Sequence, residues 1–281
     1  MRKKIALALT GTATLFALAA CGGGNSAAPS ADATLDPASP TVVKVGASPV
    51  PHAKILEFVD ENLAKEAGID LEIQEIDDFQ TPNTALDEGT LDANYYQHLP
   101  WFEDQVETKG YEFEHGEGVH IEPFAAFSDK YDDASAVPDG AKVVLTNDPA
   151  NQLRALKVLE SAGLLSNVAD DSAVLTLTDE QNPKKLEFSE VPPEQAVQVF
   201  KQDPSFDIAM INGNFILQAG LKSADALAVE SVENNPYANF LAWRAGEETA
   251  AITKLDELLH SEEVAEYIEK TWPDGDVIPA F

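Results

Sequence analysis

The chain has 281 residues with 18 basic and 49 acidic side chains, which give a formal net charge of −31. Nucleic acids and anionic lipid headgroups are bound through basic patches, so this charge argues against both as partners. The sequence contains a single cysteine, which excludes a framework of intramolecular disulfides.

Residues 1–20 have the features of a signal peptide. Arg2, Lys3 and Lys4 precede an uncharged, mostly apolar stretch over residues 5–20, which is short for a membrane span. Cys21 follows in the run Leu-Ala-Ala-Cys, which resembles the lipidation signal of bacterial lipoproteins. We therefore expect lipid on Cys21 and a mature protein anchored by it to the extracytoplasmic face of the cell membrane. The alternative is an ordinary secreted protein with a free thiol.

Residues 21–40 are predicted to form the lipidated cysteine and a flexible tether, because residues 22–40 are nearly all Gly, Ala, Ser, Pro and Asp. Strand-like and helix-like patterns alternate after residue 41. Strands are expected at 42–47, 71–76, 91–96, 142–145 and 207–211, and helices at 53–67, 83–88, 150–161 and 193–201. This alternation predicts an α/β architecture with largely parallel sheets.

Two such runs of strands and helices are joined by extended segments at 121–128 and 237–243. We expect a two-lobed fold, in which residues 41–127 and 237–281 form one lobe and residues 128–236 form the other. Ligands of such folds bind beside the carboxyl ends of the strands, so the cleft between the lobes is the expected binding site.

Catalytic motifs are missing from the sequence. It has no Gly-x-Ser-x-Gly elbow, no His-Glu-x-x-His, no phosphate-binding glycine loop and no Cys/His metal cluster at a fixed spacing. Together with the export signal, this favours a binding protein that needs no cofactor or metal over an exported hydrolase.

Aromatic residues gather at the end of the third expected strand. Tyr96 and His98 point to the same side of a strand, and Trp101 can join them once the chain turns at Pro100. Such a group of apolar rings with polar tips suits a small-ligand pocket. The alternative is ordinary core packing.

Polar residues follow the other strands. Asp148 is a good N-cap, and Asn151 and Arg154 then share one face of the helix that follows, where an arginine suits a carboxylate ligand. Asn212 ends one strand and Asn239 begins another, and amides suit a zwitterion because they both donate and accept. The alternatives are a surface arginine and turn-forming asparagines.

At these residues the chain resembles the methionine-binding lipoproteins of bacterial ABC importers, the NlpA family. The likeness covers residues 43–281 and rests on short motifs in the same order. They are Pro82-Asn83 with Ala85-Leu86, Asp92-Ala93-Asn94 with Gln97-His98, Val119-His120-Ile121-Glu122-Pro123, Asn147-Asp148-Pro149, Ala209-Met210-Ile211-Asn212, Asn234-Asn235-Pro236-Tyr237-Ala238-Asn239 and Ile278-Pro279-Ala280-Phe281.

The resemblance implies a periplasmic-binding-protein fold that closes on one amino acid and presents it to the permease and ATPase of an importer. Arg154 would then hold the ligand carboxylate, and Asn151, Asn212 and Asn239 would bond its carboxylate and ammonium groups. Phe79, Tyr96, His98 and Trp101 would surround a thioether. Tyr96 stands where the family often has Phe, Trp101 where it often has Tyr, and Gly213-Asn214 where small hydroxyl residues are common.

The leading hypothesis is therefore a methionine-binding lipoprotein of an ABC importer. Within the same class, the ligand could instead be D-methionine, a methionine-containing dipeptide or another apolar amino acid. A different class is also open, namely a surface adhesin-like lipoprotein without a transport role.

Overall fold

The computed structural model describes residues 34–281. The expected signal peptide, Cys21 and the first part of the tether lie outside the described residues, so these three stay predictions. Within residues 34–281, none of the helices combines the length and the apolar character that a membrane crossing requires.

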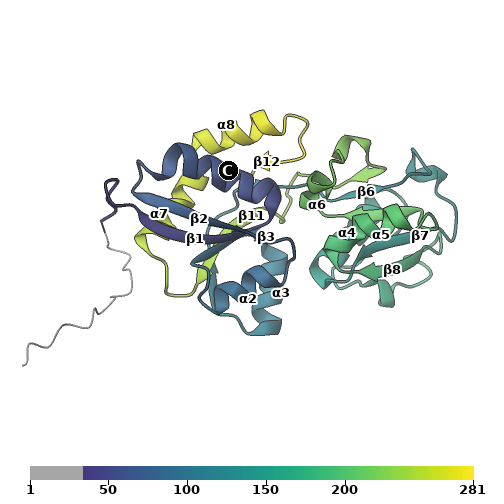
Figure 1. The fold of residues 1–281 in the computed structure, drawn as a ribbon. Helices are drawn as coiled ribbons and strands as arrows, with labels where there is room; N and C mark the ends of the chain where they lie inside the picture. The colour runs from purple at the N-terminus through teal and green to yellow at the C-terminus, as the bar shows by residue number, and fades with distance from the viewer. Residues whose placement is uncertain (1–33) are drawn as a thin grey trace, which may run out of the picture.

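The chain forms two mixed sheets that lie side by side, each with its own helices (Figure 1). The first has the order β12-β5-β11-β3-β1-β2, with β4 paired to β11. Its strands are β1 (Thr41–Ala47), β2 (Ile69–Glu75), β3 (Ala93–His98), β4 (Phe113–His115), β5 (His120–Ile121), β11 (Asn239–Arg244) and β12 (Ile278–Pro279). The second sheet has the order β10-β6-β9-β7-β8. Its strands are β6 (Ala125–Phe127), β7 (Lys142–Thr146), β8 (Glu187–Val191), β9 (Ile208–Ile211) and β10 (Ala228–Val229).

Helices pack around both sheets (Figure 1). Those of the first are the helical turns Pro49–Ala53, α1 (Lys54–Val59), the helical turns Asp60–Ala64, α2 (Thr81–Asp87), α3 (Leu99–Lys109), α7 (Ala250–Leu259) and α8 (Glu262–Thr271). Those of the second are α4 (Pro149–Ser161), α5 (Ala196–Gln202) and α6 (Gly213–Gln218), with short 3-10 turns at Ala134–Ala136, Val174–Thr176, Pro193–Gln195 and Ser223–Asp225.

The expected α/β fold with two sheets is confirmed, but the expectation of largely parallel sheets is wrong. β1 runs parallel to β2 and β3, and β7 runs parallel to β8 and β9, as strand–helix alternation predicts. The strands that pass from one sheet to the other run antiparallel to their neighbours, β6 beside β9 and β11 beside β3. A crossing strand enters its sheet directly, without the helical crossover that parallel pairing needs.

One of these crossing strands bears on the expected lobe boundary. The sequence predicts a first lobe that continues to residue 127 and therefore includes β6. In the structure, β6 pairs with β9 and β10 of the second sheet. The chain therefore passes between the sheets just before Ala125. The division into two lobes at the other expected boundaries stays a prediction.

A second difference concerns Pro100, which begins a helix instead of making a turn. His98 caps α3 by accepting a hydrogen bond from the Trp101 N–H, and Pro100 lies in the first turn of the helix. Proline is favoured there because its missing N–H would have no partner in the helix and its fixed φ already suits the helix. The result is that Trp101 lies one helical turn after the end of β3.

An apolar cluster joins the two sheets and closes the space between them. Phe79, Tyr96 and Trp101 come from the first part of the fold and pack with residues of the second, among them Ile211 and Phe215. The rings of Phe79 and Phe215 stack with their centroids 5.3 Å apart. The side chains that face each other across the cleft are therefore in contact.

Candidate ligand-binding site

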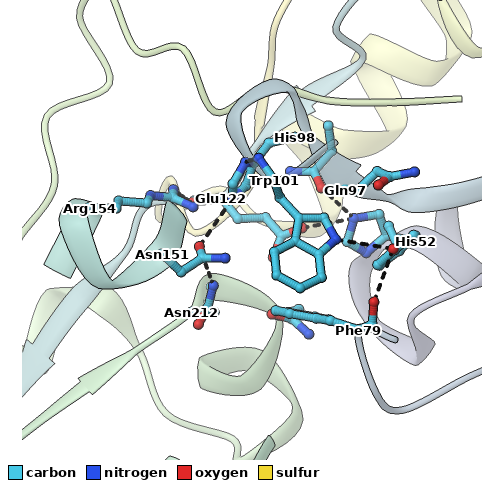
Figure 2. Close-up of a pocket in the computed structure, with 13 residues that line it drawn as sticks. His52, Phe79, Gln97, His98, Trp101, Glu122, Asn151, Arg154 and Asn212 are labelled. Atoms are coloured by element: carbon cyan, nitrogen blue, oxygen red, sulfur yellow. Dashed lines mark hydrogen bonds and ion pairs between the residues drawn. The ribbon is translucent and has the colours of Figure 1, made fainter. Parts of the chain in front are cut away.

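A narrow cavity lies between the two sheets. Residues from both sheets line it (Figure 2): His52, Phe79, Tyr96, Gln97, His98, Trp101, Glu122, Asn151, Arg154, Asn212, Gly213, Asn214 and Asn239. The eight residues expected from the sequence to bind a ligand are all in this set. The fold therefore brings all eight together around one cavity.

One side of the cavity is aromatic. The Tyr96 hydroxyl accepts a hydrogen bond from Trp101 Nε1 at 3.1 Å and donates one to the Phe79 carbonyl at 3.1 Å. The Phe79 ring centroid lies 6.0 Å from that of Tyr96 and 6.1 Å from that of Trp101. Burial raises the pKa of Tyr96, so its hydroxyl stays protonated. Because the polar tips are bonded to one another, the rings offer apolar surface to a ligand.

His98 connects this aromatic side to the polar side. Its Nδ1 accepts the Trp101 N–H at 3.3 Å, so its proton is on Nε2, which then donates to Asn151 Oδ1 at 3.1 Å. Burial, aided by the nearby charge of Arg154, lowers the pKa of His98 to about 3. The ring is therefore neutral at physiological pH and adds a fixed dipole, not a charge, to the site.

Three asparagines from different elements line the cavity, and two of them are hydrogen-bonded to each other. Asn151 is oriented by the N-cap of α4, because Asp148 Oδ1 accepts both its backbone N–H at 2.8 Å and its Nδ2 at 3.1 Å. Asn212, which follows β9, donates to Asn151 Oδ1 at 2.8 Å. Asn239, the first residue of β11, accepts from His52 Nε2 at 3.1 Å. The expected N-cap is confirmed, and the amides converge on one wall.

Arg154 is buried, with 3 % of its surface exposed, so it is not a surface arginine. Its Nε and Nη2 groups donate to the two carboxylate oxygens of Glu230 at 2.7 and 2.6 Å, and Nη2 also donates to the Glu122 carbonyl at 2.8 Å. The Tyr237 ring covers the guanidinium at 4.2 Å. Within the described residues Nη1 makes no hydrogen bond. Nη1 is therefore the terminal nitrogen of the guanidinium that the described residues leave without an acceptor.

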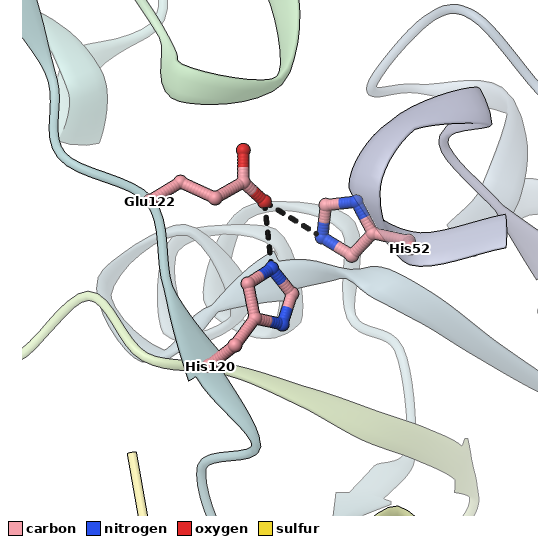
Figure 3. Close-up of side chains that lie close together, drawn as sticks. All are labelled: His52, His120 and Glu122. Carbon is pink, nitrogen blue, oxygen red and sulfur yellow. Dashed lines mark hydrogen bonds and ion pairs between the residues drawn. The ribbon is translucent and has the colours of Figure 1, made fainter. Parts of the chain in front are cut away.

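Glu122 was not expected in the site. His120 Nε2 lies 2.8 Å from Glu122 Oε1, and His52 Nε2 lies 3.2 Å from the same oxygen (Figure 3). Burial lowers the pKa of His52 to about 4 and that of His120 to about 3, and it raises the pKa of Glu122. The three residues offer metal-ligand atoms within 4.8 Å of one another, although the sequence showed no such cluster. No short spacing marks this group, because His52 lies far from the others in the chain.

Gly213 and Asn214 complete the floor of the cavity beside Glu122. A Cβ on residue 213 would lie 2.4 Å from the Cβ of Glu122, so this close approach requires glycine. Asn214 Nδ2 is buried and has no hydrogen-bond partner within the part of the chain that the structure describes. An unpaired buried donor in a pocket wall is costly unless a ligand or water accepts from it.

Comparison with known proteins shows which family the chain belongs to. Residues 43–281 match the profile of a protein family described as NlpA lipoprotein. A methionine-binding lipoprotein, MetQ, from Bacillus subtilis is 39% identical over 267 residues, which cover 93% of each chain. The chain belongs to the NlpA lipoprotein family. As a member, it is a substrate-binding lipoprotein and not an enzyme.

Solved structures agree with this family and with the two-lobed periplasmic-binding-protein fold. A lipoprotein from Actinomyces odontolyticus is 47% identical and superposes with a TM-score of 0.80, covering 86% of this chain and 99% of its own. A nutrient-binding protein from Burkholderia cenocepacia, solved bound to methionine, is 34% identical with a TM-score of 0.79, covering 85% and 100%. This NlpA lipoprotein thus shares its fold with a relative that holds methionine.

Trp101→Ala should weaken binding of methionine by this NlpA lipoprotein at least roughly ten-fold, because a buried aromatic surface is worth about 1.5–3 kcal/mol. Phe102→Ala is the matched control: it removes a buried ring from the same turn of α3, but Phe102 packs on Phe240 and does not line the cavity. Both variants should lower the free energy of unfolding by about 3–5 kcal/mol. Calorimetric titration should separate them, and equal losses of affinity would mean that Trp101 only supports the fold.

Proposed function

We propose that this NlpA lipoprotein binds methionine between its lobes and delivers it to the permease and ATPase of an ABC importer. The observation that carries the proposal is a cavity with an aromatic side and a polar side, lined by residues of both sheets. The Bacillus subtilis relative is named as a methionine-binding lipoprotein, and the Burkholderia relative was solved with methionine bound. Their names support the same ligand here.

The chemistry of the two sides fits methionine. A thioether is polarisable and packs well against aromatic rings, which Phe79, Tyr96 and Trp101 supply. On the polar side, Nη1 of Arg154 is a charged donor for the carboxylate, and Asn151, Asn212 and Asn239 add neutral donors and acceptors. The neutral ring of His98 lies between the two parts and carries no charge that would repel either end of a zwitterion.

The size of the ligand sets how complete its burial must be. The best small ligands gain about −1.5 kcal/mol per non-hydrogen atom, so methionine can reach roughly −13 kcal/mol. Nanomolar binding needs about −12 kcal/mol. Such an affinity requires nearly every atom to be in contact, which a cavity between two lobes supports.

Delivery to an importer requires the protein to be held at the membrane. We infer that lipid on Cys21 holds it at the extracytoplasmic face, and that residues 22–40 give it reach to the permease. The family consists of lipoproteins, in agreement with this anchor.

Titration of the purified lipoprotein with L-methionine, D-methionine, glycyl-methionine and leucine tests the proposal directly. We expect saturable binding of methionine and weaker binding of leucine. The absence of saturable binding for all of them would refute an amino-acid-binding function and favour the adhesin-like alternative.

Arg154→Ala should abolish methionine binding and also destabilise the fold, because it leaves the Glu230 carboxylate buried without its partner. Breaking such a pair from one side costs about 3–5 kcal/mol. The double variant Arg154→Ala/Glu230→Gln removes both charges and should recover most of this stability without recovering binding. Thermal unfolding and calorimetry measure the two effects. A double variant that binds methionine like the parent protein would exclude Arg154 from carboxylate recognition.

Cys21→Ser should release the protein from the membrane without changing its affinity for methionine. The anchor needs the thiol, whereas the cavity is built from His52 and residues that follow it in the chain. Fractionation of cells that express the variant measures the first effect, and titration of the soluble protein measures the second. A variant that still sediments with membranes would contradict the lipoprotein anchor.

A further inference from the structure

Glu122 presents an uncompensated carboxylate to the cavity. Among the described residues that line the cavity, Arg154 and Glu122 are the charged side chains, and Arg154 is already paired through two hydrogen bonds with Glu230. Glu122 is 5 % exposed, and its close partners are the rings of His52 and His120. Because both rings are neutral, they solvate the carboxylate without cancelling its charge.

The proton positions around Glu122 follow from the geometry. His52 Nε2 faces two acceptors, Glu122 Oε1 at 3.2 Å and Asn239 Oδ1 at 3.1 Å, so this nitrogen must carry the ring proton. His120 Nε2 faces Glu122 Oε1 at 2.8 Å and must also be protonated, which leaves Nδ1 to accept from the Tyr95 hydroxyl. The backbone N–H of Asn214 donates to the same carboxylate. His120 Nε2 and the Asn214 N–H thus hold the Glu122 carboxyl group at a fixed position, with His52 Nε2 close to it.

We propose that Glu122 is the binding partner of the ligand's ammonium group, and that His52 and His120 position it for that role. The inference rests on the proposed amino-acid-binding function and adds the residue that selects ligands with a free α-amino group. A buried carboxylate without a cation is costly, and an ammonium group in the cavity removes that cost.

The two charged groups of the site are linked to each other through the backbone of Glu122. Arg154 Nη2 donates to the backbone carbonyl of Glu122 at 2.8 Å. This hydrogen bond fixes the guanidinium beside the residue whose side chain carries the carboxylate. The ammonium and carboxylate of an α-amino acid are separated by a single carbon. A zwitterion bound in the cavity that Arg154 and Glu122 both line would place its carboxylate towards Arg154 and its ammonium group towards Glu122.

The same three side chains have the composition of a zinc site, but their hydrogen bonds favour an ammonium group. A metal would replace the protons on the Nε2 atoms of His52 and His120. The remaining proton of the His120 ring would then be on Nδ1, which faces the Tyr95 hydroxyl. Within the described residues His120 is the hydrogen-bond partner of the Tyr95 hydroxyl, so that hydroxyl would lose its acceptor. In the present arrangement the His120 N–H already donates to Glu122, and His52 Nε2, which donates to Asn239, lies 3.2 Å from the same carboxylate.

The test compares methionine with 4-(methylthio)butanoate, in which hydrogen replaces the ammonium group, by calorimetry on the purified full-length lipoprotein. The parent protein should prefer methionine by at least roughly 30-fold, the typical loss when one partner of a buried charge pair is removed. Glu122→Gln should weaken methionine binding by a similar factor and change binding of the analogue less than about three-fold. Glu72→Gln, which removes the same charge from the exposed face of β2, should change neither.

Equal affinity of the parent protein for the two ligands would overturn the proposal without any variant. Equal losses for both ligands in Glu122→Gln would also overturn it, since they would show a purely structural role. Loss of methionine binding after dialysis against EDTA, with recovery on adding Zn²⁺, would assign the cluster to a metal instead. If the parent protein binds no methionine at all, the proposed function itself is refuted. The titration of the parent protein shows this without any variant.

Discussion

The pairing of Arg154 with Glu230 is the interaction on which the rest of the site depends. A guanidinium this deeply buried needs a carboxylate partner, and the two side chains are 4 % and 10 % exposed. Glu230 also accepts a hydrogen bond from the Phe124 N–H at 3.2 Å, and its own N–H donates to the Phe124 carbonyl at 2.8 Å. One carboxylate therefore ties helix α4 to both segments that pass between the sheets. The cavity lies where these tied segments meet.

This pairing also limits what the arginine can do. A free guanidinium could bind a carboxylate through two parallel hydrogen bonds from one edge. In Arg154 the edge formed by Nε and Nη2 already donates to Glu230. The ligand carboxylate then has Nη1 and the neighbouring amides. In the proposed binding mode, recognition of a zwitterion is spread over a paired arginine, neutral amides and the single carboxylate of Glu122. Such a site adds little net charge of its own, which suits a ligand that is itself neutral overall.

Local signals predicted a large part of this site from the sequence. Asp148 caps helix α4, and Asn151 and Arg154 follow within its first turns. The strand, the cap and the helix are neighbours in the sequence, so their order could be predicted from it. The sequence predicts a turn at Pro100, whereas Pro100 lies in the first turn of α3. Proline is favoured in both positions, so the residue alone does not distinguish them. The sequence predicts Asn239 in the site but not its neighbours His52 and Glu122, because these residues meet only in the fold: His52 and Asn239 are 187 residues apart. No spacing rule joins residues brought together by three different elements.

A crystal structure of the protein grown with L-methionine tests the central claim most directly. The account predicts the ligand carboxylate about 3 Å from Nη1 of Arg154, the ammonium nitrogen about 3 Å from a Glu122 oxygen, and the thioether against Phe79, Tyr96 and Trp101. The Arg154–Glu230 pair should stay intact. A methionine bound in the reverse orientation, with its carboxylate on the aromatic side or its ammonium group away from Glu122, would contradict it.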